Sequence, residues 1–460
     1  MKKYILSILA ICLLISQFAG CAELGQKSNL NNSQMSDNPV EDHCSLRVLV
    51  DVEFGSSLYL DVEDELRKYK AVPSAGGEKT IGLVAAIKDA GGSENIQLEF
   101  PPKCGEERDI YLSNLRTEIM AGGGPDVFVC LSGIGFHFDK DNNFQVHYVE
   151  PIFRFPQQAM KRNMFLPLDN YIKTAKHMEW DKLTQVVMKA GRTEKGQMLL
   201  PMTYTVPTTL FRKSDVKSAL SKEMKWDDMF FQDTALGVAA VSDTSTLMGS
   251  ALAPLADFEN DKLAFSEEDL TRFCEKITNH QTLENDNTIP HFRFNLKVLD
   301  SFKLNDYNEA FKNDDSFTLV PLYSRNGGYM ATVTSFVGIN ANAKNPESAF
   351  SVVDYLLGEE CQRSKLYAFM TYDNAVPTLD GLMTQGTSVS TGNNKKWTMP
   401  DPLYNEFCAV RDNIKFSEFA TPLERELQQL YIDLTTSTSK SKETMIHDAY
   451  MRMNMELAES

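Results

Sequence analysis

The chain has 460 residues, of which 42% are hydrophobic, and a formal net charge of −17 at pH 7. At roughly 100–200 residues per domain, this length predicts two or three domains. The acidic balance and the absence of Lys/Arg blocks interleaved with aromatic residues exclude nucleic acid as an expected partner. After residue 21 no apolar run is long enough to cross a membrane, so we expect the rest of the chain to form a globular body in water.

The first 20 residues have the pattern of a cleaved export signal. Lys2 and Lys3 precede an apolar run at residues 4–15, and small residues lead up to Cys21. This segment resembles the lipobox of bacterial lipoproteins, although Phe18 stands where leucine is usual. The resemblance implies that the signal at 1–20 is removed and that Cys21 carries the lipid, palmitate included, that anchors the protein to the membrane outside the cytoplasm. An ordinary secretory signal is the alternative.

Residues 21–43 are expected to form the tether behind this anchor. They are rich in Asn and Ser and almost lack large apolar side chains, so they cannot bury a core. A flexible coil spans about 5–6 Å times the square root of its residue number. The tether would therefore let a folded body that starts at residue 44 reach a partner in the same membrane.

The cysteines that follow the anchor favour neither a metal cluster nor a particular disulfide. They are Cys44, Cys104, Cys130, Cys274, Cys361 and Cys408, and none stands in a C-x-x-C pair. An exported chain can form disulfides, but the spacings are wide and many pairings are open. We predict no pairing and no cofactor.

An α/β pattern begins at residue 46. Residues 46–52, 96–100 and 126–130 are typical of strands, and residues 107–120 carry apolar side chains at helical spacing. The glycines at 122–124 follow this helix and precede a strand, which favours a helix stop over a phosphate loop. Strands that alternate with helices predict parallel pairing, with ligands beyond the carboxyl ends of the strands.

Later segments predict further elements. Asn345 and Pro346 form an N-cap and first-turn pair before a helix with an apolar stripe. Apolar residues at helical spacing mark two packing helices, at 423–434 and 446–457. The apolar run at 237–241 is predicted to be a strand that ends in a helix-capping corner at Ser242, Asp243 and Thr244.

Five short motifs stand in the order found in the family 1 extracellular solute-binding proteins, the receptors of ABC importers for sugars. The chain resembles this family at AGGGPDV (121–127), FLPLD (165–169), GQMLLP with FRKSD (196–201 and 211–215), VGINANAKNP (337–346) and NAVP (374–377). Phe211 and Arg212 depart from the family consensus. The resemblance extends over most of residues 46–460.

The resemblance implies an α/β fold with two lobes, of the type II periplasmic-binding-protein class, with hinge-crossing segments and a ligand cleft between the lobes. Lobe 1 would comprise residues 44–205 and 320–374, and lobe 2 residues 206–319 and 375–460. The chain would capture a small polar ligand, expected to be a sugar or oligosaccharide, and deliver it to the subunits of an ABC permease by lobe closure. We expect a monomer without enzymatic activity.

Other functions stay open at the level of the sequence. The receptor could serve a membrane sensor kinase instead of a permease, or the fold could be a binding scaffold without transport. A glycan-processing enzyme is not excluded by motif, because the two carboxylates of a glycoside hydrolase can lie anywhere in a sequence. S-x-x-K occurs at 214–217 and 437–440 without a downstream K-T-G, so we treat both as chance and predict no catalytic residue.

Candidate ligand contacts lie in loops that follow strands. Phe54 and Ser56 follow the first strand, and Ser132 follows the third. Tyr204 lies just past the inferred crossing strand, and Asp243 lies at the corner after residue 241. Each has a structural alternative, which is an ordinary loop for the first three, core packing for Tyr204 and helix capping for Asp243.

The loop at 321–329 is the strongest local candidate. It combines aromatic rings, a guanidinium and an amide beside two glycines, and such groups can stack on a sugar ring and hydrogen-bond to it. The residues concerned are Tyr323, Arg325, Asn326 and Tyr329. A surface turn is the alternative. The chain has only three tryptophans, Trp180, Trp226 and Trp397, which argues against an oligosaccharide platform built on tryptophan.

One metal pattern needs weighing. Asp139, Asp141, Asn143 and Glu150 match ligand positions of a calcium-binding loop. Phe144 replaces the glycine that such a loop needs for its sharp turn. We therefore favour a solvated acidic loop and predict no metal site.

Overall fold

The computed structural model describes residues 45–52, 82–93, 95–102, 105–131, 136–138, 146–241, 244–284, 291–292, 316–364, 376–379, 401–436 and 440–459. The chain divides into two compact units, Met1–His43 and Cys44–Ser460. The first unit, with the predicted signal, Cys21 and the whole predicted tether, lies outside the described residues. Every element below belongs to the second unit.

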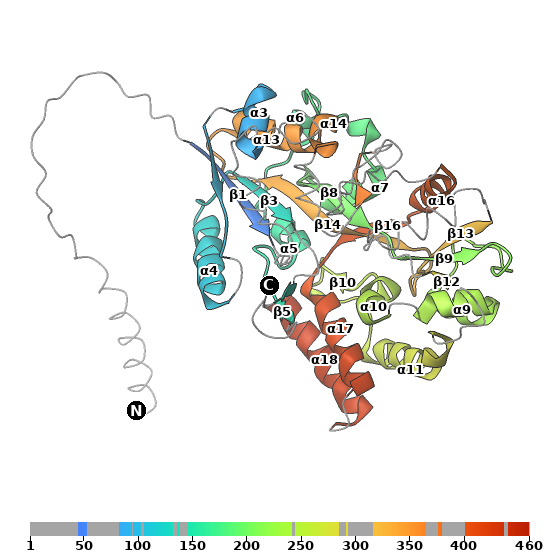
Figure 1. Cartoon of the computed structure of the whole chain (residues 1–460). Helices are drawn as coiled ribbons and strands as arrows, with labels where there is room; N and C mark the ends of the chain where they lie inside the picture. The colour runs from blue at the N-terminus through green and yellow to red at the C-terminus, as the bar shows by residue number, and fades with distance from the viewer. Residues whose placement is uncertain are drawn as a thin grey trace, which may run out of the picture. The chain divides into compact units, whose positions relative to one another are not determined.

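A large mixed sheet with the strand order β15-β8-β14-β3-β1-β2 forms the centre of the second unit, and β16 pairs with β14 (Figure 1). β1 (Leu46–Val52) runs parallel to β2 (Ile96–Glu99) and to β3 (Val127–Leu131). The strands predicted at 46–52, 96–100 and 126–130 are therefore confirmed, and they pair in parallel as expected.

The remaining strands of the large sheet come from later in the chain. β14 (Met330–Ile339) runs antiparallel to β3 and to β8 (Leu199–Thr205). β15 (Val376–Pro377) lies antiparallel beside β8, and β16 (Phe416–Phe419) lies parallel to β14. Segments more than 200 residues apart in sequence thus share one sheet. For example, Phe128 of β3 pairs with Leu49 of β1 on one side and with Gly338 of β14 on the other.

Both faces of the large sheet are covered. Val48 and Val50 join a buried cluster with α3 (Leu83–Asp89) and α13 (Pro346–Leu357). Leu49 and Phe128 join a cluster on the opposite face, where α4 (Glu106–Met120) packs. Because side chains alternate along a strand, a sheet covered on both faces needs strands that are apolar throughout. This explains why β3 is apolar throughout and why Val48, Leu49 and Val50 of β1 are all buried.

α4 ends at the glycine triplet, as predicted. The N–H of Gly123 donates to the carbonyl of Glu118 at 2.9 Å, and Gly122 has a φ of +85°. That left-handed backbone is readily adopted by glycine and disfavoured for other residues. The triplet terminates the helix and turns the chain into β3.

A smaller sheet has the order β12-β9-β13. Its strands are β9 (Thr208–Arg212), β12 (His291–Phe292) and β13 (Phe317–Pro321). β9 follows β8 after Val206 and Pro207, and β13 leads through residues 322–329 into β14. These connections carry the chain from one sheet to the other and back.

The helices beside the smaller sheet include one correction. α9 (Thr234–Val241) occupies the segment predicted as a strand at 237–241, so that prediction is wrong. Asp233 begins the helix, since its carboxylate accepts the N–H of Leu236 at 2.8 Å and its carbonyl accepts the N–H of Gly237 at 3.0 Å. A run that is buried on all sides has no period, so its pattern cannot separate a buried helix from a buried strand.

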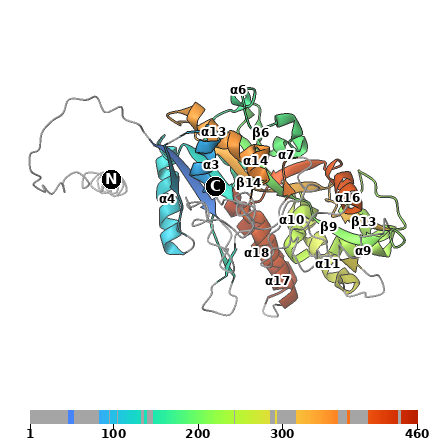
Figure 2. The ribbon, with the colours of Figure 1, turned by 45° about the horizontal axis from the view of Figure 1, so that its top comes forward.

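The predicted packing helices are confirmed as α17 (Pro422–Thr436) and α18 (Lys442–Ala458), which lie side by side (Figure 2). α17 also packs on α10 (Thr244–Leu252), and α18 packs on α11 (Glu267–Glu284). The capping prediction for α13 is confirmed too, because the side chain of Asn345 accepts the N–H of Ser348 at 3.1 Å.

The other elements are shorter and complete the chain. They are β4 (Phe136–Phe138), β5 (Val146–Tyr148), α5 (Pro156–Lys161), α6 (Asp169–Ile172), η1 (Trp180–Lys182), α7 (Gln185–Met188), η2 (Lys189–Gly191), β6 (Arg192–Thr193), β7 (Gly196–Gln197), α8 (Trp226–Gln232), β10 (Ala256–Asp257), β11 (Lys262–Leu263), α14 (Glu359–Gln362) and α16 (Asp401–Arg411).

Within the described part of the chain, no helix is both long and apolar enough to cross a bilayer. The same residues contain no group of three His, Cys, Asp or Glu side chains placed to hold a metal. The predicted acidic loop at 139–145 lies outside them, and Glu150 pairs with Arg154 and Arg425. Cys274, Cys361 and Cys408 are free thiols, and burial raises the pKa of Cys274 to about 12.

Candidate functional site

The carboxyl ends of β1, β3 and β8 meet at one edge of the large sheet. β1 ends at Val52, β3 at Leu131 and β8 at Thr205, and the two former pair directly. Phe54 and Ser56 follow β1 in sequence, Ser132 follows β3, and Asp243 precedes α10 in sequence. All of these lie outside the described residues. Their ligand contacts therefore stay predictions.

A buried ion pair braces this edge. Asp51 is completely buried, and Nη2 of Arg108 donates to its Oδ1 at 2.5 Å. The other carboxylate oxygen accepts the N–H of Ile152 at 2.7 Å, while Nε of Arg108 donates to the carbonyl of Glu150 at 2.9 Å. Asp51 therefore acts in the fold, because it fixes residues 150–152 beside the end of β1.

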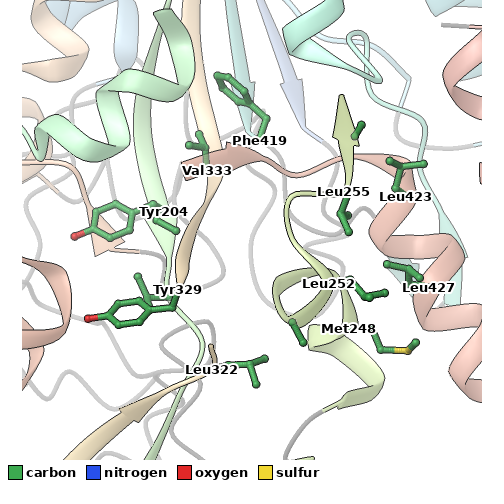
Figure 3. Close-up of a cluster of buried hydrophobic side chains, with 14 of the residues drawn as sticks. Tyr204, Met248, Leu252, Leu255, Leu322, Tyr329, Val333, Phe419, Leu423 and Leu427 are labelled. Atoms are coloured by element: carbon green, nitrogen blue, oxygen red, sulfur yellow. The ribbon is translucent and has the colours of Figure 1, made fainter. Parts of the chain in front are cut away.

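Tyr204 lies in the hydrophobic core at the crossing. Its exposure is 0%, and it shares a buried cluster with Tyr329, Val333 and Phe419. Figure 3 shows the rings of Tyr204 and Tyr329 pointing in the same direction, with Leu252 and Leu423 on the far side of the cluster. Core packing, the alternative raised from the sequence, describes this position.

The loop at 321–329 turns its aromatic side chains inward. Tyr323 and Tyr329 are buried with their ring centroids 5.5 Å apart at 85°, and the hydroxyl of Tyr329 donates to the carbonyl of Val410 at 2.7 Å. Burial raises the pKa of Tyr323 to about 12, and it raises the pKa of Tyr329 well above its usual value. In this conformation the two tyrosines join β13, β14 and α16, and ligand stacking by them stays a prediction.

Arg325 and Asn326 occupy different surroundings. Nε of Arg325 donates to the carbonyl of Leu252 at 2.7 Å, and Nη2 donates to the carbonyls of Ala264 and Pro254. Its guanidinium also lies over the ring of Phe265, with 5.8 Å between Cζ and the centroid. Arg325 thus ties the crossing loop to the chain after α10. Asn326 is exposed in the loop, and its ligand contact stays a prediction.

A polar row across the crossing strands was not predicted. Thr332 of β14 pairs with Thr205 of β8 on one side and with Glu418 of β16 on the other. Side chains of residues directly opposite on neighbouring strands point to the same face of a sheet. Thr332 and Glu418 are half-buried and Thr205 is nearly covered. No sequence signal marks this row, because its members are 86 and more residues apart and only strand pairing unites them.

Glu418 also meets the chain that follows α10. The backbone N–H of Leu255 donates to its carboxylate, and Arg325 and Glu424 lie near enough to influence its charge. Burial, with a smaller contribution from Glu424, raises the pKa of Glu418 to about 7. A carboxylate that changes charge near neutral pH thus lies where the large sheet meets the turn before β10.

Two of the motifs that carry the family resemblance, AGGGPDV and VGINANAKNP, meet at the opposite end of the strands of the large sheet. Asp126 precedes β3 and Asn340 follows β14, which is antiparallel to β3, so both stand at the amino end of β3. Nδ2 of Asn340 donates to the carbonyls of Gly123 at 2.8 Å and Pro125 at 2.9 Å. Oδ2 of Asp126 accepts the N–H of Arg47 at 2.9 Å. These residues support the scaffold, and they carry no information about the ligand.

Replacing Asn340 by alanine should lower the free energy of unfolding by about 2–3 kcal/mol, because buried carbonyls lose their donors. Asn342→Ala, at an exposed position two residues away, should change it by less than about 0.5 kcal/mol. Urea unfolding of both variants measures the difference. Equal losses for the two would contradict the role given to Asn340.

No protein-family model matches the chain, and no curated protein matches it in sequence. Among solved structures, a family 1 extracellular solute-binding protein from Alicyclobacillus acidocaldarius superposes with a TM-score of 0.50 and 14% identity, over 90% of this chain and 98% of that one. The chain has the fold of the family 1 extracellular solute-binding proteins. The predicted two-lobed α/β class is thereby confirmed.

Two sugar-binding proteins with this solute-binding fold are also similar. The sugar-binding protein MalE from Xanthomonas citri gives a TM-score of 0.49 at 12% identity, over 90% of this chain and 98% of that one. A periplasmic oligogalacturonide binding protein from Yersinia enterocolitica gives 0.47 at 12% identity, over 90% and 99%. At these identities and TM-scores, the two comparisons carry no argument about the ligand of this chain.

Proposed function

We propose that this protein is an extracytoplasmic receptor for a small polar ligand, a sugar or oligosaccharide, which it delivers to an ABC permease. The observation that carries the proposal is the pair of sheets joined by crossing segments, β8 to β9 and β13 to β14. The carboxyl ends of β1 and β3 face the side where these segments leave the large sheet. Lipid anchoring at Cys21 belongs to the proposal as well.

The lobes would be organised around these crossings. We propose lobe 1 around the large sheet and lobe 2 around the smaller sheet, with boundaries near residues 205, 320 and 374 as expected from the sequence and with β15 and β16 as returns to the large sheet. β16 pairs with β14, and α17 packs on α10, so a further crossing would lie at residues 420–421. Such short connections can act as hinges, since a few residues absorb the change of backbone angles.

A sugar is favoured by the polar row at the crossing. Hydroxyls and a carboxylate can donate to and accept from the adjacent hydroxyls of a saccharide. Trp226 does not offer a stacking platform, because it is buried and its Nε1 donates to the carbonyl of Ala240 at 3.1 Å. Polar contacts would thus contribute more than tryptophan stacking.

The proposed mechanism is closure of the lobes on the ligand. A ligand that touches both lobes is bound more tightly by the closed state, and only this difference in affinity can shift the population. The permease would then recognise the closed form. No chemical step is proposed, so the ligand would leave unchanged.

A binding screen tests this function. The chain from residue 44 onward would be heated with glucose, maltose, maltotriose, trigalacturonate, amino acids and polyamines, and each ligand recovered by chromatography. A saccharide at 100 times its dissociation constant should add about 2.7 kcal/mol to the stability. If only amino acids or polyamines stabilise the protein, the proposal of a sugar ligand is rejected. If a saccharide is recovered in a chemically changed form, the protein is an enzyme.

Variants at the predicted contacts refine the test. Ser132→Ala should weaken saccharide binding by about fivefold or more, as expected for one lost hydrogen bond. Ser113→Ala, on the exposed side of α4, is the matched control and should bind like the wild type. Unchanged binding by the Ser132 variant would remove this residue from the site while leaving the receptor function standing.

A further inference from the structure

The crossing strands present two different faces. Tyr204, Val333 and Phe419 occupy one row across β8, β14 and β16, and their exposures are 0%, 1% and 1%. The next row consists of Thr205, Thr332 and Glu418, in which Thr332 and Glu418 retain access to solvent. Because adjacent rows point to opposite faces, the polar row faces away from this core.

At its Glu418 end, the polar row lies beside elements of the proposed lobe 2. The N–H of Leu255, which lies between α10 and β10, donates to the carboxylate of Glu418. Arg325 approaches from the crossing loop and is bonded to the carbonyls of Leu252, Pro254 and Ala264. The side chains of Glu418 and Arg325 and the backbone N–H of Leu255 therefore converge at one place.

The remaining charged neighbour is Glu424, in the first turn of α17. Its Oε2 accepts the N–H of Thr421 at 2.9 Å and the hydroxyl of Thr421 at 2.6 Å. These bonds hold the Glu424 carboxylate at the helix start, close enough to oppose ionisation of Glu418. Glu424 therefore has a capping role, whereas Glu418 is a half-buried residue whose carboxylate accepts one backbone N–H, that of Leu255.

We infer that Glu418 is a ligand-contacting residue of the receptor, with its carboxylate accepting hydrogen bonds from adjacent hydroxyls of the saccharide and Thr332 supplying the neighbouring contact. This inference rests on the proposed function. Under this inference, residues of the crossing strands themselves contribute directly to ligand specificity. A ligand without vicinal hydroxyls would supply the carboxylate with no such donors and would bind more weakly.

The inference predicts a pH dependence with a definite sign. An ionised carboxylate is the stronger acceptor for hydroxyl donors, and the pKa of Glu418 in the absence of ligand is raised to about 7. Below this pH the side chain is mostly neutral, and above it the side chain is charged. Saccharide affinity should therefore rise as the pH increases from 6 to 8. Hydroxyls that donate to the carboxylate would lower its pKa in the complex.

Isothermal titration calorimetry at pH 6, 7 and 8 tests this on the chain from residue 44 onward. The probes are glucose, maltose, maltotriose and trigalacturonate. Glu418→Gln should bind about tenfold or more weakly at pH 8 and should show a flat pH profile. Gln matches the neutral form in size, so the variant should fold, and its melting temperature checks this. Thr332→Val should bind several-fold more weakly and keep the pH dependence.

Glu426→Gln is the matched control. Glu426 also lies on the C-terminal part of the chain and is paired, with Oε2 2.7 Å from Nε of Arg452, but it lies away from the crossing strands on α17. It should bind like the wild type at every pH. If the wild type binds a saccharide and Glu418→Gln binds it with the same affinity and the same pH profile, this inference is overturned and the proposed function stands. Wild type that binds none of the four saccharides would overturn the proposed function and this inference together.

Discussion

Replacing Arg108 by methionine should lower the free energy of unfolding by about 3–5 kcal/mol, the largest loss that we expect from a single substitution. Arg108 and Asp51 are 1% and 0% exposed, and their charged groups are 2.5 Å apart. Without the guanidinium, the Asp51 carboxylate would stay buried with the N–H of Ile152 as its remaining donor in the described structure. Urea unfolding of the chain from residue 44 onward measures the loss.

An exposed ion pair provides the control for Arg108. Nε of Arg363 lies 2.6 Å from Oε1 of Glu359, and both side chains are at least a third exposed. Arg363→Met should cost less than about 1 kcal/mol, because water solvates the carboxylate that remains. The double variant Arg108→Met with Asp51→Asn should be more stable than Arg108→Met alone. A loss below about 1 kcal/mol for Arg108→Met would show that the buried pair does not stabilise this edge of the sheet.

Replacing Gly191 by alanine should lower the free energy of unfolding by about 3 kcal/mol. A Cβ at this position would fall well inside the van der Waals radius of the backbone carbonyl oxygen of Leu199. That oxygen also accepts Nε2 of Gln197 at 2.7 Å, and the carbonyl of Gly191 accepts the N–H of Met198 at 2.8 Å. The start of β8 would have to move, because no flexible side chain can give way.

Gly91 is the control for this substitution. It has a φ of +81°, and a Cβ there would meet no atom within 4 Å. Gly91→Ala should therefore cost only the backbone strain, about 1 kcal/mol. Thermal and urea unfolding of the two variants separate steric overlap from strain. A smaller loss for Gly191→Ala than for Gly91→Ala would mean that η2 and β8 are not packed as closely as described.

Local sequence patterns were sufficient to predict those helices and strands whose buried positions recur at regular spacing along the chain. β3 is apolar throughout and β1 is apolar except at Arg47 and Asp51, because helices cover both faces of the sheet, and α17 and α18 present apolar residues at every third or fourth position. The caps at Asn345 and at residues 122–124 act within a few residues of themselves. Information of this kind is local, so the sequence carries it directly.

Predictions from local sequence patterns failed for segments whose structure depends on contacts with distant parts of the chain. The run at 237–241 forms a helix because Asp233 caps it, and its burial on every side erases the period that would have shown this. The loop at 321–329 has side chains that suit a sugar, yet Arg325 and Tyr329 bond to carbonyls at Leu252 and Val410. Those partners are 73 and 81 residues away in sequence, and the residues of the loop do not predict them.

The sequence by itself thus determined the α/β class, the order of the family motifs and the main packing helices. The tertiary structure alone decided which polar groups meet. Asp51 and Arg108 form a buried ion pair. Thr205, Thr332 and Glu418 lie in one row because of the register of β8, β14 and β16. The physical reason is that strand register and burial are properties of segments distant in sequence, and these properties set both the charge of Glu418 and the groups that a ligand can reach.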